Sequence, residues 1–257
     1  MIHPIPSGTR DVLPQETGEV RLITDTLRRV FDEHGYGEIY TPALEYESVL
    51  ARADMAEALA VLCSSLEAVG LKDFRIGVGD ASLFPALMES LQVPQDHRDG
   101  LLQALVRRNF VELEHLLDQA GVSGEAAELL LDVPQRRGGP ELLTDAPAPA
   151  VEAVTGMRRV YELLDPSVAA RVIFDLGLIR NIGYYTGAVF EVYDPAIGAP
   201  IGGGGRYDEL LGRFGRSLPA VGFALYVDSL HQALAGEERG TGALSELRTV
   251  AAAGESR

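Results

Sequence analysis

Four consecutive glycines at residues 202–205 restrict what this chain of 257 residues can build more than any other feature. With four β-carbons missing, the backbone can approach a ligand closely, or large neighbouring side chains can press against it. The run is not a phosphate-binding loop, because no Gly-Lys-Ser/Thr follows it, and no strand–helix unit with dinucleotide spacing surrounds it. Taken alone, the run fits a ligand site and a tight structural bend equally well.

Aromatic and basic residues near the glycines favour the ligand site. Arg180, Tyr184 and Tyr185 precede the run, and Arg206 and Tyr207 follow it, so we expect them on two neighbouring strands or at their ends. Adjacent tyrosines on a strand point to opposite faces, so one can enter the core while the other lines a pocket. An arginine beside them suits a carboxylate, and the set suits a small zwitterion with a polar ring. The alternative for each tyrosine is core packing with its hydroxyl at the surface.

The hydrophobic pattern predicts an α+β fold with a mainly antiparallel sheet flanked by helices. We expect one domain over 1–235, with a helical insertion at about 81–133 and a linker at 134–150. The tail at 236–257 lacks an apolar period and is expected to be disordered. Strands are expected over 38–41, 74–78, 171–176, 184–193 and 220–225, and helices from about 15 to 34 and over 51–69, 151–164 and 226–234.

Charge and composition exclude several functions. The net charge of −16 and the lack of a dense basic stripe argue against tRNA or DNA as a partner, because phosphates require Lys and Arg. Cys63 is the one cysteine and lies in an apolar helical series, which predicts a partly buried residue rather than a reactive thiol. The five histidines show no metal-ligand spacing, so we expect neither a metal nor a cofactor. Without a signal peptide or a membrane-length apolar run, the expected location is the cytoplasm.

Three blocks in the expected order resemble histidyl-tRNA synthetases. Residues 8–14 (Gly-Thr-Arg-Asp-Val-Leu-Pro) and 36–45 resemble their first motif, whose proline, matched by Pro42, belongs to a dimer interface. Residues 180–187 (Arg-Asn-Ile-Gly-Tyr-Tyr-Thr-Gly) resemble their histidine-specific signature. Residues 202–208 with 219–224 resemble the glycine-rich strand and third motif. The resemblance implies a class II aminoacyl-tRNA synthetase-like core. It places Arg180, Tyr185 and Tyr207 in a histidine pocket with Gly203 and Gly204 as its floor.

Departures from the family pattern decide the expected function. Ser229 stands where active members have an ATP-contacting arginine, Tyr226 replaces a small glycine, and Gly183 replaces the signature aspartate. The central block with the second motif is missing between the first motif and the helix at 51–69, and so is the anticodon-binding domain. Because adenylyl transfer needs cations to offset phosphate charge, no catalytic residue is expected. The missing block leaves it open whether the pocket closes, and whether the loss is natural or a deletion.

The pattern of retained and lost motifs resembles the regulatory subunits of short-form ATP phosphoribosyltransferase in histidine biosynthesis. The resemblance implies a separate catalytic subunit as partner, self-association as a dimer, and histidine as the effector. The alternatives are a degenerate or minimal histidyl-tRNA synthetase-like enzyme, a stand-alone histidine-binding module, and a poorly folding deletion product.

Overall fold

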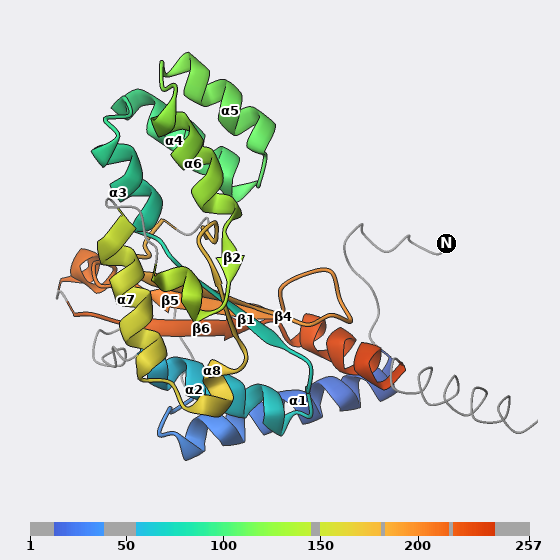
Figure 1. Cartoon of the computed structure of the whole chain (residues 1–257). Coiled ribbons are helices and arrows are strands. Elements are labelled where there is room, and N and C mark those ends of the chain that lie inside the picture. The colour runs from blue at the N-terminus through green and yellow to red at the C-terminus, as the bar shows by residue number, and fades with distance from the viewer. Residues whose placement is uncertain (1–12, 39–54, 145–149, 181–182, 216–217, 240–257) are drawn as a thin grey trace, which may run out of the picture.

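The computed structural model describes residues 13–38, 55–144, 150–180, 183–215 and 218–239 (Figure 1). The helices are α1 (Pro14–Glu33), α2 (Met55–Ala68), α3 (Leu83–Ser90), α4 (Gln95–Val106), α5 (Phe110–Gln119), α6 (Glu125–Asp132), α7 (Val151–Glu162), α8 (Pro166–Ala169) and a last helix over 227–239. The strands are β1 (Arg75–Asp80), β2 (Arg137–Gly138), β3 (Val172–Asp175), β4 (Ala188–Tyr193), β5 (Gly202–Arg206) and β6 (Val221–Leu225).

The six strands form one mixed sheet in the order β2-β3-β1-β4-β5-β6. Every neighbouring pair is antiparallel except β1 and β3, which are parallel. The predicted α+β fold with a mainly antiparallel sheet is therefore confirmed. The parallel pair was not expected, and it arises because the chain between β1 and β3 crosses through the helices from α3 to α8 before it returns to the sheet.

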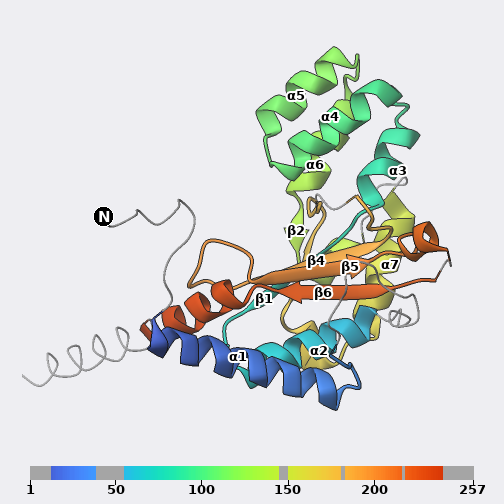
Figure 2. The ribbon, with the colours of Figure 1, turned by 180° about the vertical axis from the view of Figure 1, so that it is seen from behind.

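The two faces of the sheet differ in what covers them. One face carries the large apolar side chains of the strands and packs against α2 and α7, with α1 lying on α2 (Figures 1 and 2). Phe74, Ile76, Phe174 and Phe190 on this face are at most 1% exposed. Burial of such side chains is the dominant stabilising term. The opposite face holds glycines, polar residues and a few apolar side chains such as Ile173, and the candidate site lies there.

Four helices, α3 to α6, stand out from the sheet as a group between β1 and β2 (Figures 1 and 2). Their apolar rows meet inside the group, where Leu101, Leu105, Leu113 and Leu117 are at most 4% exposed. Arg108, two residues after the end of α4, donates to the Asp175 carboxylate at the end of β3 over 2.8 Å. That these helices form a separate unit of the domain stays a prediction.

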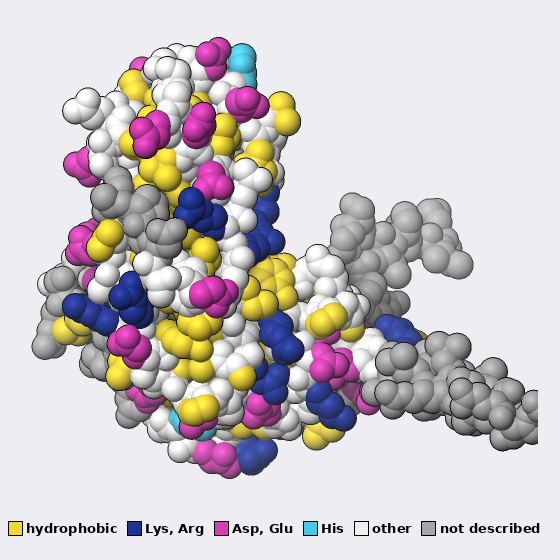
Figure 3. All heavy atoms as spheres, in the orientation of Figure 1, with side chains coloured by type: hydrophobic (Ala, Val, Ile, Leu, Met, Phe, Trp, Pro, Cys, Tyr) yellow, Lys and Arg dark blue, Asp and Glu magenta, His cyan; other side chains and the backbone are white. Residues whose placement is uncertain are grey.

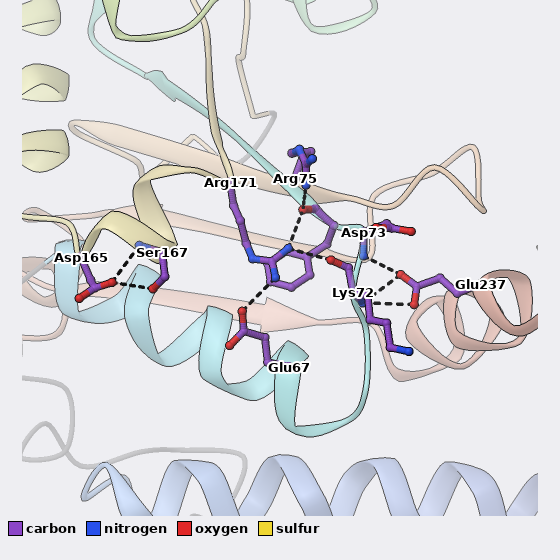
Figure 4. Close-up of polar contacts among 9 residues, drawn as sticks. Glu67, Lys72, Asp73, Arg75, Asp165, Ser167, Arg171 and Glu237 are labelled. Atoms are coloured by element: carbon purple, nitrogen blue, oxygen red, sulfur yellow. Dashed lines mark hydrogen bonds and ion pairs between the residues drawn. The ribbon is translucent and has the colours of Figure 1, made fainter. Parts of the chain in front are cut away.

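The last helix was predicted to end at residue 234 and extends to residue 239. Residues 236–239, which were expected to be disordered, are helical. The Glu237 carboxylate accepts hydrogen bonds from the backbone N–H groups of Lys72 (3.0 Å) and Asp73 (2.8 Å), which holds this turn against the start of β1 (Figure 4). Close by, Arg171 pairs with Glu67 over 3.0 Å, and its guanidinium lies 4.0 Å from the centroid of the Phe74 ring. The rest of the expected tail lies outside the described residues.

Two further expectations are corrected. The expected linker at 134–150 contains strand β2 and short 3-10 helices at Val133–Gln135 and Pro140–Leu143, because residues 137–138 pair with β3. The expected strand at 184–193 begins only at Ala188, because Tyr184 and Tyr185 pack on each other and on Tyr207 instead of joining the ladder. The expected strand at 38–41 and the start of the helix at 51 lie outside the described residues, apart from Glu38, which is not in a strand. None of the described helices is long and apolar enough to span a membrane.

Candidate functional site

The site is built on the glycine-lined face of β5. Gly203 and Gly205 point to the same side of the strand because side chains alternate. A β-carbon at Gly203 would overlap Nη1 of Arg180 and would lie 2.6 Å from the Phe190 carbonyl oxygen. A β-carbon at Gly205 would lie 2.7 Å from the ring of Tyr185. The glycine run therefore lets an arginine and a tyrosine lie flat on the sheet.

Three tyrosines form a cluster next to the arginine. The Tyr184 ring centroid lies 4.8 Å from that of Tyr185 and 5.4 Å from that of Tyr207, in edge-on or tilted contacts. The Tyr207 hydroxyl reaches β6, where a β-carbon at Gly222 would lie 2.7 Å from it. Burial raises the pKa of Tyr185 and of Tyr207, so both hydroxyls stay protonated at neutral pH and can donate hydrogen bonds.

Arg180 is held by the inner strand β4 and yet keeps donor capacity. Its side chain is 8% exposed, and Nη1 donates to the Phe190 carbonyl oxygen over 3.1 Å. Nη1 also lies 3.5 Å from a Glu191 carboxylate oxygen, and Nη2 lies 3.5 Å from the Tyr226 hydroxyl. Its buried Nε has no hydrogen-bond partner among the described residues. The described protein groups therefore leave this guanidinium partly unsatisfied.

A cavity of about 440 Å³ surrounds these groups and continues around β6 toward α1 and α2. Its size fits a small ligand. Among the described residues that line it, Arg180 is the only one with a formal charge, so the cavity offers one cation to an anionic group such as a carboxylate, although Glu191 at 3.5 Å offsets part of its charge. The lining residues are Phe31, Tyr36, Ala58, Val61, Arg180, Tyr184, Tyr185, Gly203, Tyr207, Val221, Gly222, Phe223, Ala224 and Tyr226.

The structure brings most of the predicted site residues together. Arg180, Tyr184, Tyr185, Gly203 and Tyr207 all line this cavity. Binding of a ligand there stays a prediction.

Two predicted residues are not among the lining residues. Gly204 faces the core side, where a β-carbon would meet the Phe190 ring at 2.7 Å. Arg206 donates to the Asp208 carboxylate over 2.8 Å. Pro42 lies outside the described residues.

Other lining residues were missed by the sequence analysis. Phe31 of α1 and Phe223 of β6 meet edge to face at 5.9 Å and form the wall beyond the β6 edge. In the sequence, Phe31 is indistinguishable from a core residue on the apolar face of its helix, so no pattern could have indicated it. Tyr226, which replaces a small glycine of the family pattern, also lines the cavity. No group of three metal-ligating side chains occurs among the described residues.

The fold and the cavity define a class of protein, an α+β domain with a small-ligand cavity on the glycine-lined face of a mainly antiparallel sheet. The sequence model of the Histidyl-tRNA synthetase family matches residues 8–55 and 51–230 of this chain. The chain belongs to that family.

Curated relatives carry a more specific name. The ATP phosphoribosyltransferase regulatory subunit of Desulforamulus reducens is 37% identical over 203 residues, which cover 77% of this chain and 51% of the relative. The chain spans about half the length of the first curated relatives it matches. A subunit of the same name from Caldanaerobacter subterraneus aligns over 318 residues at 27% identity. Because this exceeds the 257 residues of the chain, the relative has residues within the alignment that this chain lacks, as expected for a missing block.

Solved structures support the fold. A structure from Bacillus halodurans, titled an ATP phosphoribosyltransferase regulatory subunit/histidyl-tRNA synthetase, has a TM-score of 0.78 at 23% identity. The match covers 91% of this chain and 84% of that one. An ATP phosphoribosyl transferase (HisG:HisZ) complex from Thermotoga maritima contains a chain with a TM-score of 0.55 at 21% identity, covering 70% of this chain and 64% of that one.

Proposed function

We propose that this chain is a non-catalytic regulatory subunit of ATP phosphoribosyltransferase, which binds histidine around Arg180 and associates with a separate catalytic subunit. The names of the curated relatives support the subunit role. The Thermotoga maritima structure is titled as a complex of two kinds of chain, which supports a partner of this type.

The observation that carries the histidine assignment is the position of Arg180. Its partly unsatisfied guanidinium lies on the glycine floor, at a cavity whose other described lining residues carry no formal charge. A carboxylate there accepts charge-assisted hydrogen bonds in a partly buried site, which strengthens them. The protonated hydroxyls of Tyr185 and Tyr207 supply donors for a polar ring, and the aromatic walls supply its stacking surface.

The same cavity argues against adenylation by this chain. Transfer of an adenylyl group requires cations around the phosphates, and Arg180 is the one cation among the described lining residues. Its Nη1 already lies 3.5 Å from Glu191. The Tyr226 hydroxyl lies 3.5 Å from Nη2 of Arg180, and Tyr226 occupies part of the cavity wall beside this cation. We therefore infer that the chain binds the amino acid without activating it.

Co-purification with a short catalytic subunit of ATP phosphoribosyltransferase tests the proposal. We expect a complex whose phosphoribosyl transfer exceeds that of the catalytic subunit alone and falls when histidine is added. Arg180→Met should remove the histidine effect. Arg213→Met, which changes an exposed arginine outside the cavity, should leave it unchanged. The regulatory role would be refuted if no complex forms, or if the rate of phosphoribosyl transfer changes neither on addition of this chain nor on addition of histidine.

Two simpler assays separate the alternatives. A minimal synthetase predicts histidine-dependent exchange between pyrophosphate and ATP, and we expect none. A stand-alone histidine-binding module predicts heat of histidine binding in calorimetry without association with the catalytic subunit. Self-association as a dimer is tested by light scattering of the purified chain.

A further inference from the structure

The face of the sheet that carries the cavity continues past it as an open surface. Register places Arg75 opposite Tyr193, and Gly77 opposite both Glu191 and Ile173, so these positions share that face. Ile173 is 40% exposed and Tyr193 is 37% exposed, and Arg75 is exposed as well. The helices α2 and α7 pack on the opposite face. Two large apolar side chains and an arginine thus lie partly exposed on the middle strands of the sheet.

This surface is basic although the chain is strongly acidic. Arg108 and Arg137 approach the same oxygen of Asp175, at 2.8 and 2.9 Å, so two cations share one carboxylate. Among the described residues no carboxylate pairs with Arg75, whose guanidinium donates to the Phe74 carbonyl oxygen. Figure 3 shows Lys and Arg side chains gathered below the helical insertion, beside a hydrophobic patch. Positive charge therefore exceeds negative charge here, against a net charge of −16 for the whole chain.

The other carboxylate of this group of residues, Glu191, has its own partners in the same domain. It accepts a hydrogen bond from the Tyr193 hydroxyl and lies 3.5 Å from Nη1 of Arg180. It therefore does not cancel the charge of Arg75, Arg108 and Arg137. We name these three arginines, with Ile173 and Tyr193, the basic sheet face.

The charge decides which occupant the basic sheet face fits. A two-fold contact between copies of this chain would place the same arginines opposite one another, which is repulsive. A protein that presents carboxylates around an apolar side chain is complementary, since Arg and Tyr with a central aliphatic residue are the composition of interface hot spots. We propose that the basic sheet face is the docking surface for the catalytic subunit of ATP phosphoribosyltransferase, an inference that rests on the proposed function.

Charge reversal at the surface tests this inference. The variant Arg75→Glu/Ile173→Glu changes two exposed positions. Neither residue lines the cavity, and neither takes part in a described ion pair. We expect it to weaken binding to the catalytic subunit at least about tenfold, which is the size of a moderate hot-spot loss. Binding of the wild-type chain should also weaken as salt rises from 50 to 300 mM, roughly as screening of exposed charges requires.

A matched control uses the same chemistry on α7. The variant Arg159→Glu/Leu163→Glu replaces an exposed arginine and an exposed leucine at the end of that helix and changes the net charge equally. We expect its affinity for the catalytic subunit to stay within about twofold of wild type. Histidine binding by both variants, measured by calorimetry, reports that the fold is intact.

The outcomes separate the two proposals. If the wild-type chain forms no complex, the proposed function and this docking surface both fail. If the wild-type chain binds but the sheet variant binds equally well, or the α7 variant loses as much affinity, only the docking surface is overturned.

Discussion

Arg180 lies on Gly203 so closely that the strand has no room for a β-carbon at this position. Any side chain at residue 203 would overlap Nη1 of Arg180 and press on the Phe190 carbonyl oxygen, to which Nη1 donates. The glycine run is therefore explained by what lies on it rather than by a bend, because residues 202–206 form a strand of the sheet. This excludes the tight bend that the sequence left open, and binding of a ligand at the glycine run stays a prediction.

The first prediction concerns Gly203→Ala. The added methyl group displaces the Arg180 guanidinium, so histidine affinity measured by calorimetry should fall at least about tenfold, while overpacking costs about 1–3 kcal/mol of stability. Gly198→Ala serves as control, because nothing lies within 4 Å of a β-carbon at that position. Unchanged histidine binding by the Gly203 variant would contradict the role of the arginine.

Local signals made much of the fold predictable. The hydrophobic pattern predicted the helix from about 15 to 34, whose Ile23, Leu27 and Val30 are buried in α1, and the strand over 74–78 predicted most of β1. Five of the predicted residues line the cavity because arginine, tyrosine and glycine cluster in two short segments, whereas Gly204 and Arg206 of the second segment do not line it. In each case the information lies within a few residues of the sequence.

The parts that were not predicted depend on distant contacts. The two-residue strand β2 exists because Arg137 and Gly138 pair with β3, far along the chain. The turn at 236–239 is helical where Glu237 caps backbone groups of residues 72 and 73. The aromatic content of residues 184–187 indicated a strand. Tyr184 and Tyr185 instead pack on the Tyr207 ring, so these residues do not join the strand β4. Local propensity cannot report such pairings.

The second prediction concerns the carboxylate that joins the helical insertion to the sheet. Asp175→Asn removes the charge shared by Arg108 and Arg137 and should cost at least about 1 kcal/mol, since both arginines then lack their ionic partner. Hydrogen exchange should rise in α4 and α5 before it rises in β1. Asp132→Asn is the control, because the Asp132 side chain is 57% exposed against 10% for Asp175, so its pair with Arg136 should matter less. Equal effects of the two variants would exclude a special role for Asp175.

The third prediction concerns pH. Burial raises the pKa of Asp194, and the neighbouring Glu237 carboxyl raises it further, although the Ala196 N–H opposes this. Folding therefore favours the protonated form. The stability that this contributes is complete below the unfolded pKa of the group and is lost as the pH rises through the raised pKa. Asp194→Asn should accordingly raise the melting temperature at pH 7 and have little effect near pH 3.

The pKa of Asp165 is shifted in the opposite direction, so its effect on stability has the opposite pH dependence. Hydrogen bonds from the Ser167 hydroxyl and N–H lower its pKa, so its ionised form stabilises the fold above the unfolded pKa and stops doing so as the pH falls. Asp165→Asn should lower the melting temperature at pH 7 and converge with wild type in acid. A parallel response of the two variants to pH would contradict both assignments.

The fourth prediction concerns Cys63, the only cysteine of the chain. The side chain lies inside α2 and is 4% exposed, and burial raises the pKa of the thiol to about 12. Because the thiolate is the reactive form, iodoacetamide at pH 8 should label the folded chain at least about a hundredfold more slowly than the chain in urea. Cys63→Ser gives the labelling background. Ala58 and Val61 of the same helix line the cavity, so histidine bound there should suppress local opening of α2 and slow the labelling further. Fast labelling of the folded chain would show instead that α2 is not held against the sheet.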